Sequence, residues 1–290
     1  MSAQLAETIA PGYVLQRGEA PLLLSMPHPG SGLAGLEPRF ESAWLARVDC
    51  DWWLPQLYAF AGKLGATLLH TTLSRSVIDL NRDPSGASLY PGQATTGLVP
   101  TETFDGVPLY REGQMPDGAE IDERRRLYFE PYHALLRAEL QRLRARHPRV
   151  VLYDCHSIRS RVPRLFDGEL PLYNLGSNSG ASADAALIDA VRATLQADGR
   201  PFVVDGRFKG GWITRHYGRP ADGVHALQME LACRGYMDEP STLTEQDWPT
   251  PLDAARAAPT QATLERVLRA ALHWAAGPAD RDDDRGPGAG

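Results

Sequence analysis

The sequence predicts an α/β fold: a single domain with a mixed, mostly parallel central sheet flanked by helices. Short apolar runs alternate with longer segments of helical periodicity along most of the 290 residues. Four of these runs, at 21–26, 76–80, 150–154 and 224–229, lead into polar residues. Such a pattern is typical of buried strands whose carboxyl ends border a ligand site.

The expected elements follow one another along the chain. After the strand at 21–26 we expect a helix over 40–64, which Pro55 would kink or split. Strand material at 67–70 and 74–80 comes next, and then a Gly- and Pro-rich loop over 83–118. The later elements are a helix over 122–147 with the arginines 124–126 on its solvent side, the strand at 150–154, a helix over 183–197 begun by Ser182, strands at 201–206 and 224–231, and a last helix over 260–276.

Composition narrows the class of protein. The net charge of -6 argues against a general nucleic-acid-binding protein. No apolar run approaches the ~18 residues that a membrane span needs. The three cysteines form no CxxC pair, and the N-terminal segment lacks a signal-peptide pattern, so we expect a cytoplasmic protein. Residues 277–290 are acidic and Gly-rich, which predicts a disordered tail.

Two histidines stand at predicted strand ends, His28 after the first strand and His156 after the strand at 150–154. An α/β sheet would bring these ends to one edge. Such a pair suggests a metal site that needs a third protein ligand. Asp49 and Asp51 are the nearest acidic candidates, and Glu230, at the end of another strand, is a candidate general base.

Arginines gather in or beside the loops that follow the strands, which indicates an anionic substrate because guanidinium groups bind carboxylates in bidentate fashion. The alternative is that they form ordinary surface ion pairs. The residues concerned are Arg75, Arg82, Arg159, Arg161, Arg164, Arg207 and Arg215.

The sequence closely resembles the N-formylglutamate amidohydrolases of bacterial histidine degradation. The resemblance runs from about residue 20 to 240 and rests on motifs in matching order: SMPHPG, DCDWWLPQLY, SRSVIDLNR, TTGLVP, DCHSIRS, FDGELPLYNLGSN, GRFKGGWITRHYG and HALQMELACRGYMDE. It implies a single catalytic domain over 1–276, similar in organisation to zinc carboxypeptidases and aspartoacylase-type deacylases. It also implies hydrolysis of N-formyl-L-glutamate to formate and L-glutamate.

The resemblance further implies one divalent metal ion, with Zn²⁺ expected and Fe²⁺, Mn²⁺ or Co²⁺ as alternatives that the same ligands accept. His28 matches the first metal ligand of the similar enzymes and His156 the last. Those enzymes carry an acidic ligand three residues after the first histidine, but this chain has Ser31 there. We therefore assign the acidic ligand to Asp51, in preference to Asp49.

The remaining roles also come from the resemblance. Glu230 matches the general base, and Arg75 matches an arginine that polarises the scissile carbonyl. Asn81 and Arg82 match the carboxylate-binding pair. Beyond the resemblance, we expect Arg159 or Arg215 to bind the second carboxylate and His216 to be a further pocket residue. The expected partner is thus a small anionic N-acyl amino acid. Two alternatives stay open: a general N-acyl amino acid deacylase, and a carboxylate-binding protein without catalysis.

Overall fold

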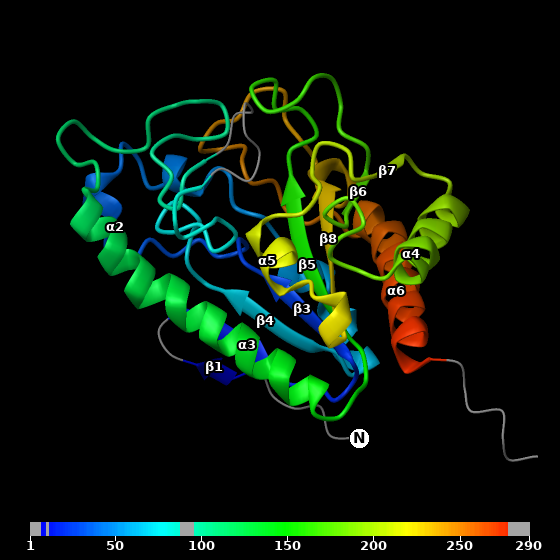
Figure 1. The fold of residues 1–290 in the computed structure, drawn as a ribbon. Helices are drawn as coiled ribbons and strands as arrows, with labels where there is room; N and C mark the ends of the chain where they lie inside the picture. Colours follow the sequence, from blue (N-terminus) through cyan, green and yellow to red (C-terminus); the bar gives the residue numbers. More distant parts are fainter. Residues whose placement is uncertain (1–6, 10–11, 88–95, 278–290) are drawn as a thin grey trace, which may run out of the picture.

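In the part of the chain that the structure describes, eight strands form a mixed sheet in the order β1-β2-β4-β3-β5-β8-β6-β7 (Figure 1). The computed structural model describes residues 7–9, 12–87 and 96–277. The strands are β1 (Glu7–Ile9), β2 (Tyr13–Gln16), β3 (Leu22–Met26), β4 (Thr67–Thr71), β5 (Val150–Ile158), β6 (Tyr173–Gly176), β7 (Phe202–Val204) and β8 (Val224–Ala232).

The central strands β4, β3, β5 and β8 are parallel to one another. β2 and β6 pair with them in antiparallel fashion, and β7 lies parallel to β6 at the edge of the sheet. The prediction of an α/β domain with a mixed, mostly parallel sheet is therefore confirmed. Of the predicted tail at 277–290, residues 278–290 lie outside the described residues, as do residues 88–95 of the predicted loop.

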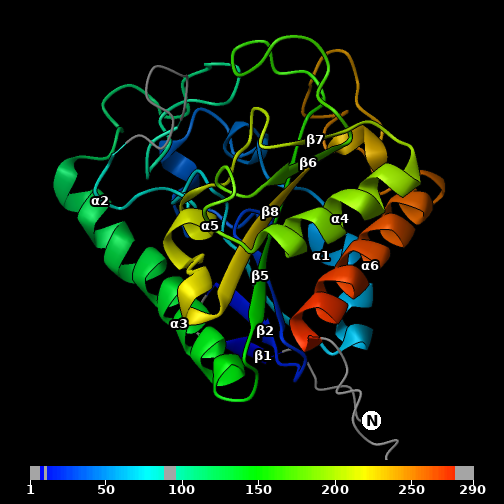
Figure 2. The ribbon, with the colours of Figure 1, turned by 45° about the vertical axis from the view of Figure 1, so that its right-hand side comes forward.

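Helices cover both faces of the sheet (Figure 2). α3 (Glu130–Arg144) and α5 (Trp212–Tyr217) pack on one face, and α4 (Ala185–Asp198), α6 (Ala254–Ala276) and the short α1 (Leu54–Leu57) pack on the other. α2 (Gly118–Arg124) leads into α3 through the π-helical η4 (Arg125–Phe129). The 3₁₀ segments are η1 (Glu37–Arg39), η2 (Leu45–Arg47), η3 (Ala59–Leu64), η5 (Pro220–Asp222) and η6 (Cys233–Gly235).

The two faces divide the side chains of β5 by simple alternation, because neighbours on a strand point in opposite directions. Tyr153 and Cys155 are buried in the core beneath α4 and α6. Leu152 is buried on the side of α3 and α5. Alternation then places Asp154 and His156 on the α3 side, with the Cys155 side chain on the opposite face.

Two predicted elements in the first third of the chain are wrong. Residues 40–64 do not form one helix but the short segments η2, α1 and η3, joined by turns. Trp53 precedes Pro55 with a left-handed φ of 65°, which interrupts any continuous helix. Residues 74–80 form no strand, and Ser74, Arg75 and Asp79 in this segment are buried polar residues. Apolar Val77, Ile78 and Leu80 gave this segment its strand-like appearance.

The later helices match the predicted positions with shifted ends. α4 begins after Asp184, whose carboxylate caps the helix, rather than after Ser182. α6 begins six residues earlier than predicted, at Ala254 after the capping residue Asp253. Arg124 was expected on the solvent side but is buried, and it donates to the Val77 carbonyl and the Tyr110 hydroxyl. Among the described residues no helix is long and apolar enough to cross a membrane.

Candidate metal centre and substrate pocket

The site lies where β5 and β8 extend beyond their neighbours (Figure 1). Each has nine residues, whereas β3 and β4 have five. His156 is paired with Glu230 and Asp154 with Gln228 across the parallel ladder. His156 therefore lies inside β5, not after it as predicted, whereas Glu230 lies near the end of β8, as predicted. Since all four residues point to the same face, the sheet backbone itself fixes their relative positions.

Two loops place His28 and Asp51 next to these residues of β5 and β8. His28 comes two residues after β3, and its carbonyl accepts a 2.9 Å hydrogen bond from the Asp51 amide. Asp51 precedes α1, which begins at Leu54. One Asp51 oxygen, Oδ2, lies 3.2 Å from His156 Nδ1 and 3.7 Å from His28 Nδ1. All three side chains are buried, and one ligand atom from each lies within 4.8 Å of the others.

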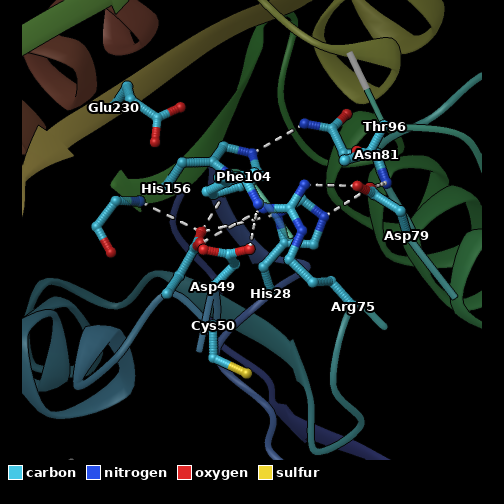
Figure 3. Close-up of polar contacts among 12 residues, drawn as sticks. His28, Asp49, Cys50, Arg75, Asp79, Asn81, Thr96, Phe104, His156 and Glu230 are labelled. Carbon is cyan, nitrogen blue, oxygen red and sulfur yellow. Dashed lines mark hydrogen bonds and ion pairs between the residues drawn. The ribbon is translucent and has the colours of Figure 1, made fainter. Parts of the chain in front are cut away.

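The second nitrogen of each histidine is held by another carboxylate. His28 Nε2 lies 2.7 Å from Asp79 Oδ1 (Figure 3), and His156 Nε2 lies 2.8 Å from Asp154 Oδ2. A carboxylate on one ring nitrogen fixes the tautomer and leaves the other nitrogen to bind a metal. Among the described residues, His28 Nδ1 and Asp51 Oδ1 have no hydrogen-bond partner, although both are buried. These donors therefore fit a divalent cation.

Charge in the cluster also suits a cation. Burial alone would raise the pKa of Asp51, but hydrogen bonds with His156 and His28 hold that pKa below its usual value. Burial likewise would lower the pKa of His156, yet Asp154 and Asp51 raise it well above the ordinary value. The negative charges that favour a proton on His156 would also favour a metal ion there.

Glu230 is a buried carboxyl group next to this cluster, and Figure 3 shows it beside His156. Burial raises its pKa to about 8; His156 opposes this shift and Asp51 adds to it. Gln228 Nε2 donates to Glu230 Oε2 at 3.2 Å, while Gln228 Oε1 accepts from the Gly211 amide at 2.7 Å. Because the Gly211 contact orients the amide, Gln228 presents its NH₂ group to Glu230.

Asp79 connects the metal cluster with the arginines. One oxygen contacts His28, and the other accepts from Arg75 Nη2 at 2.6 Å and lies 3.5 Å from Arg82 Nη2. Burial alone would raise the pKa of Asp79, but Arg82, His28 and Arg75 hold it well below its usual value. Burial would lower the pKa of Arg75, yet the neighbouring aspartates raise it, so the guanidinium stays charged over the ring of Phe104.

Asn81 and Arg82 behave differently although they are adjacent. The Asn81 side chain donates to Asp154 Oδ2 at 3.1 Å and accepts from the Ile213 amide at 2.7 Å. The Asn81 amide thus helps to position Asp154, the carboxylate that contacts His156. A Cβ at Gly211 would lie 2.3 Å from Asn81 Nδ2, so only glycine fits against the Asn81 side chain. Arg82 donates to the carbonyl and hydroxyl of Thr96, both at 3.0 Å.

A pocket opens beside the cluster, and its lining includes the predicted residues His28, Arg75, Asn81, Arg82, His156 and Glu230. The three other predicted substrate-binding residues are not part of this lining. Arg159 pairs with Asp105 at 2.7 Å and Asp49 at 3.5 Å. Arg215 and His216 belong to α5, and His216 stacks on Trp212 and borders a separate groove beside α3.

The structure also brings in residues that the sequence reasoning did not assign to the site. Asp79 and Asp154 hold the histidines, Gln228 contacts Glu230, and Arg207 and Phe208 line the pocket. A usable signal existed for Asp154, which stands two residues before His156 on a strand and so shares its face. Asp79 had no such signal because its segment resembled a strand.

The fold and the site together define an α/β protein with a His-Asp-His candidate metal centre, a buried carboxyl group and an arginine-lined pocket. The chain matches the N-formylglutamate amidohydrolase family over residues 20–237. N-formylglutamate deformylases from Pseudomonas putida and Pseudomonas aeruginosa are 46% and 47% identical to it, over 90% and 89% of this chain and 95% of each of theirs. The chain therefore belongs to this family, and the resemblance seen in its motifs is confirmed.

A solved structure supports the fold independently. The N-formylglutamate amidohydrolase from Ralstonia eutropha JMP134 has a TM-score of 0.74 to this chain at 24% identity. The match covers 91% of this chain and 98% of that one. The shared architecture thus extends across nearly the whole length of both proteins.

Proposed function

We propose that the protein is a metal-dependent amidohydrolase that cleaves N-formyl-L-glutamate to formate and L-glutamate. Its family and the 46% and 47% identical deformylases support the substrate. The observation that carries the chemistry is the buried Glu230 beside three converging metal donors in an arginine-lined pocket.

His28 and His156, each through Nδ1, and Asp51 through its carboxylate are the residues that would hold the metal. Zn²⁺ suits two imidazoles and one carboxylate, and Fe²⁺, Mn²⁺ or Co²⁺ would accept the same donors. A bound cation would supply Lewis-acid activation of a water molecule and of the formyl carbonyl. Asp79 and Asp154 fix the two imidazole rings in the orientation that this binding needs.

Glu230 is the proposed general base and acid. It takes one proton from the attacking water, whose oxygen then forms a bond to the formyl carbon. When the C–N bond breaks, Glu230 returns that proton to the nitrogen, and formate and the amine of glutamate are released. A carboxyl group whose pKa is raised to about 8 by burial can both accept and return a proton near neutral pH.

Arg75 is the proposed stabiliser of the negative charge that develops on the formyl oxygen. It is buried, and Asp79 holds it, so it needs no rearrangement during the reaction. Electrostatic donors of this kind contribute about 10²- to 10³-fold in kcat. Arg82, held by Thr96, is the proposed partner of one substrate carboxylate.

A comparison of acyl groups tests the reaction. We expect kcat/KM for N-formyl-L-glutamate to exceed that for N-acetyl-L-glutamate by at least about 10-fold, since one extra methyl group in a closed site costs on that order. Amine release from both compounds at saturating Zn²⁺ provides the measurement. Equal or faster hydrolysis of the acetyl compound would instead identify a general N-acyl amino acid deacylase.

A further inference from the structure

We propose that Arg207 binds the side-chain carboxylate of the substrate and thereby selects dicarboxylic N-acyl amino acids. This inference rests on the proposed function. N-formyl-L-glutamate carries two carboxylates, and a site that takes both needs two cationic partners besides the arginine at the reacting carbonyl.

The pocket supplies three arginines, and two of them already have a place in the mechanism. Arg75 is bound to Asp79 beside the metal donors, and Arg82 belongs to the same segment and contacts Asp79 and Thr96. Arg207 reaches the pocket from a different part of the chain, the loop after β7, at the other end of the sheet from β4. The two cationic groups thus come from segments that follow strands on opposite sides of β5.

The loop that carries Arg207 is anchored on both sides of that residue. Before it, the Asp205 amide donates to the Leu175 carbonyl at 2.7 Å, and the Asp205 carboxylate accepts from the Ser177 amide at 2.7 Å. After it, the Lys209 carbonyl accepts from the Asn178 amide at 2.6 Å. Anchored ends reduce the entropy lost when the arginine binds an anion.

The guanidinium itself is oriented by its surroundings. Arg207 Nε donates to the Leu165 carbonyl at 2.8 Å, and the group lies over the Phe208 ring, 5.3 Å from its centre. Leu165, Phe208 and Phe104 add apolar surface to the same pocket. Apolar side chains around the Arg207 guanidinium would suit a short methylene chain that ends in a carboxylate. The side chain of glutamate has this structure.

The other arginines near the strand ends are less suitable. Arg159 and Arg215 both stand outside the pocket lining, whereas Arg207 is part of it. Arg207 therefore takes the role that the sequence suggested for Arg159 or Arg215.

The test compares Arg207→Gln with the wild-type enzyme on N-formyl-L-glutamate and on N-formyl-L-glutamine, whose side chain is neutral and of the same shape. We expect Arg207→Gln to lower kcat/KM for the glutamate compound by about 10- to 100-fold, mainly through KM, because a charge-assisted pair is lost. For the glutamine compound the change should stay below about 3-fold, on the order expected when no charged pair is lost. Arg207→Lys keeps the charge and should retain part of the preference.

Arg161→Gln is the matched control because Arg161 is exposed and pairs with Glu169 at 2.9 Å. It should leave both values unchanged, and melting temperatures and bound metal would show that every variant folds. Equal losses on both compounds, or an undiminished preference for glutamate in Arg207→Gln, would overturn the role of Arg207. Failure of the wild-type enzyme to release formate from either compound would instead reject the proposed function, and the role of Arg207 with it.

Discussion

The site has two halves that are built in different ways. The strand half consists of Asp154, His156, Gln228 and Glu230, which stand on the paired strands β5 and β8. The loop half consists of His28, Asp51, Arg75, Asp79 and Arg82, which come from irregular segments. Backbone hydrogen bonds of the sheet position the strand half, whereas side-chain contacts, most of them through Asp79, position the loop half.

The two halves should therefore differ in their response to substitution. A side chain removed from the strand half leaves the ladder, and so the backbone positions of that half, in place. Removal of the Asp79 carboxylate, the hub of the loop half, would release His28, Arg75 and Arg82 together.

Glu230→Gln should abolish nearly all turnover while leaving the fold and the metal unaffected. Loss of a general base costs about 10²- to 10⁴-fold in kcat, and the glutamine side chain would occupy the same place on β8 as the glutamate that it replaces. Formate release and metal content are the measurements, with the exposed Glu112→Gln as control. Activity within about 10-fold of wild type would remove Glu230 from the mechanism, since a general base contributes more than that.

Asp79→Asn and Asp154→Asn form a matched pair across the two halves. Both should weaken metal binding by about 10- to 100-fold, because each carboxylate orients a metal-binding histidine. At saturating metal we expect Asp79→Asn to be the slower enzyme by about 10-fold, since it also weakens the hold on Arg75. Metal titration followed by kcat/KM at saturation separates the two effects. Equal rates for the two variants would contradict the idea of Asp79 as a hub.

His133 on α3 lies outside the pocket and contacts the segment that carries Asp79 and Arg82. Its ring nitrogens contact the Leu80 carbonyl at 2.9 Å and the Tyr217 hydroxyl at 3.0 Å. Burial lowers the pKa of His133 to about 3; the Leu80 carbonyl opposes this shift, and His216 and Arg137 add to it. The unfolded chain therefore binds a proton near pH 6.5 that the folded protein rejects, and stability falls as the pH drops from 6.5 toward 3.

Between pH 8 and pH 6 this group should cost the wild-type protein about 1 kcal/mol of unfolding free energy. His133→Gln should lack that contribution, so its stability should change less over the same interval. Denaturant unfolding of both proteins, with metal bound, gives the difference between the two losses. Parallel losses in the two proteins would show that His133 does not remain neutral in the folded state.

The same contrast explains what the sequence could predict. His28, His156 and Glu230 were found because apolar runs led into them, and the topology of an α/β sheet brings such ends together. Asp51 was chosen over Asp49, and Asp51 lies with His28 and His156 in the candidate metal centre, whereas Asp49 accepts a hydrogen bond from the Phe104 amide.

The sequence could not predict contacts that depend on how irregular segments fold. The role of Asp79 could not be predicted because the apolar residues Val77, Ile78 and Leu80 made its segment resemble a strand. In the structure these three residues are buried, but they belong to a segment of turns. Arg159, Arg207 and Arg215 all come after strands in the sequence. Which of them lines the pocket depends on the three-dimensional path of the chain after each strand. Nothing in local sequence periodicity encodes that path.

The most direct test of the proposed function is formate release from N-formyl-L-glutamate by the purified protein as isolated, after chelation, and after a divalent metal is restored. We predict activity that disappears with the chelator and returns with about one equivalent of Zn²⁺ or Fe²⁺ per chain, because three protein donors form one site. Formate release that persists in fully metal-free protein would contradict the account.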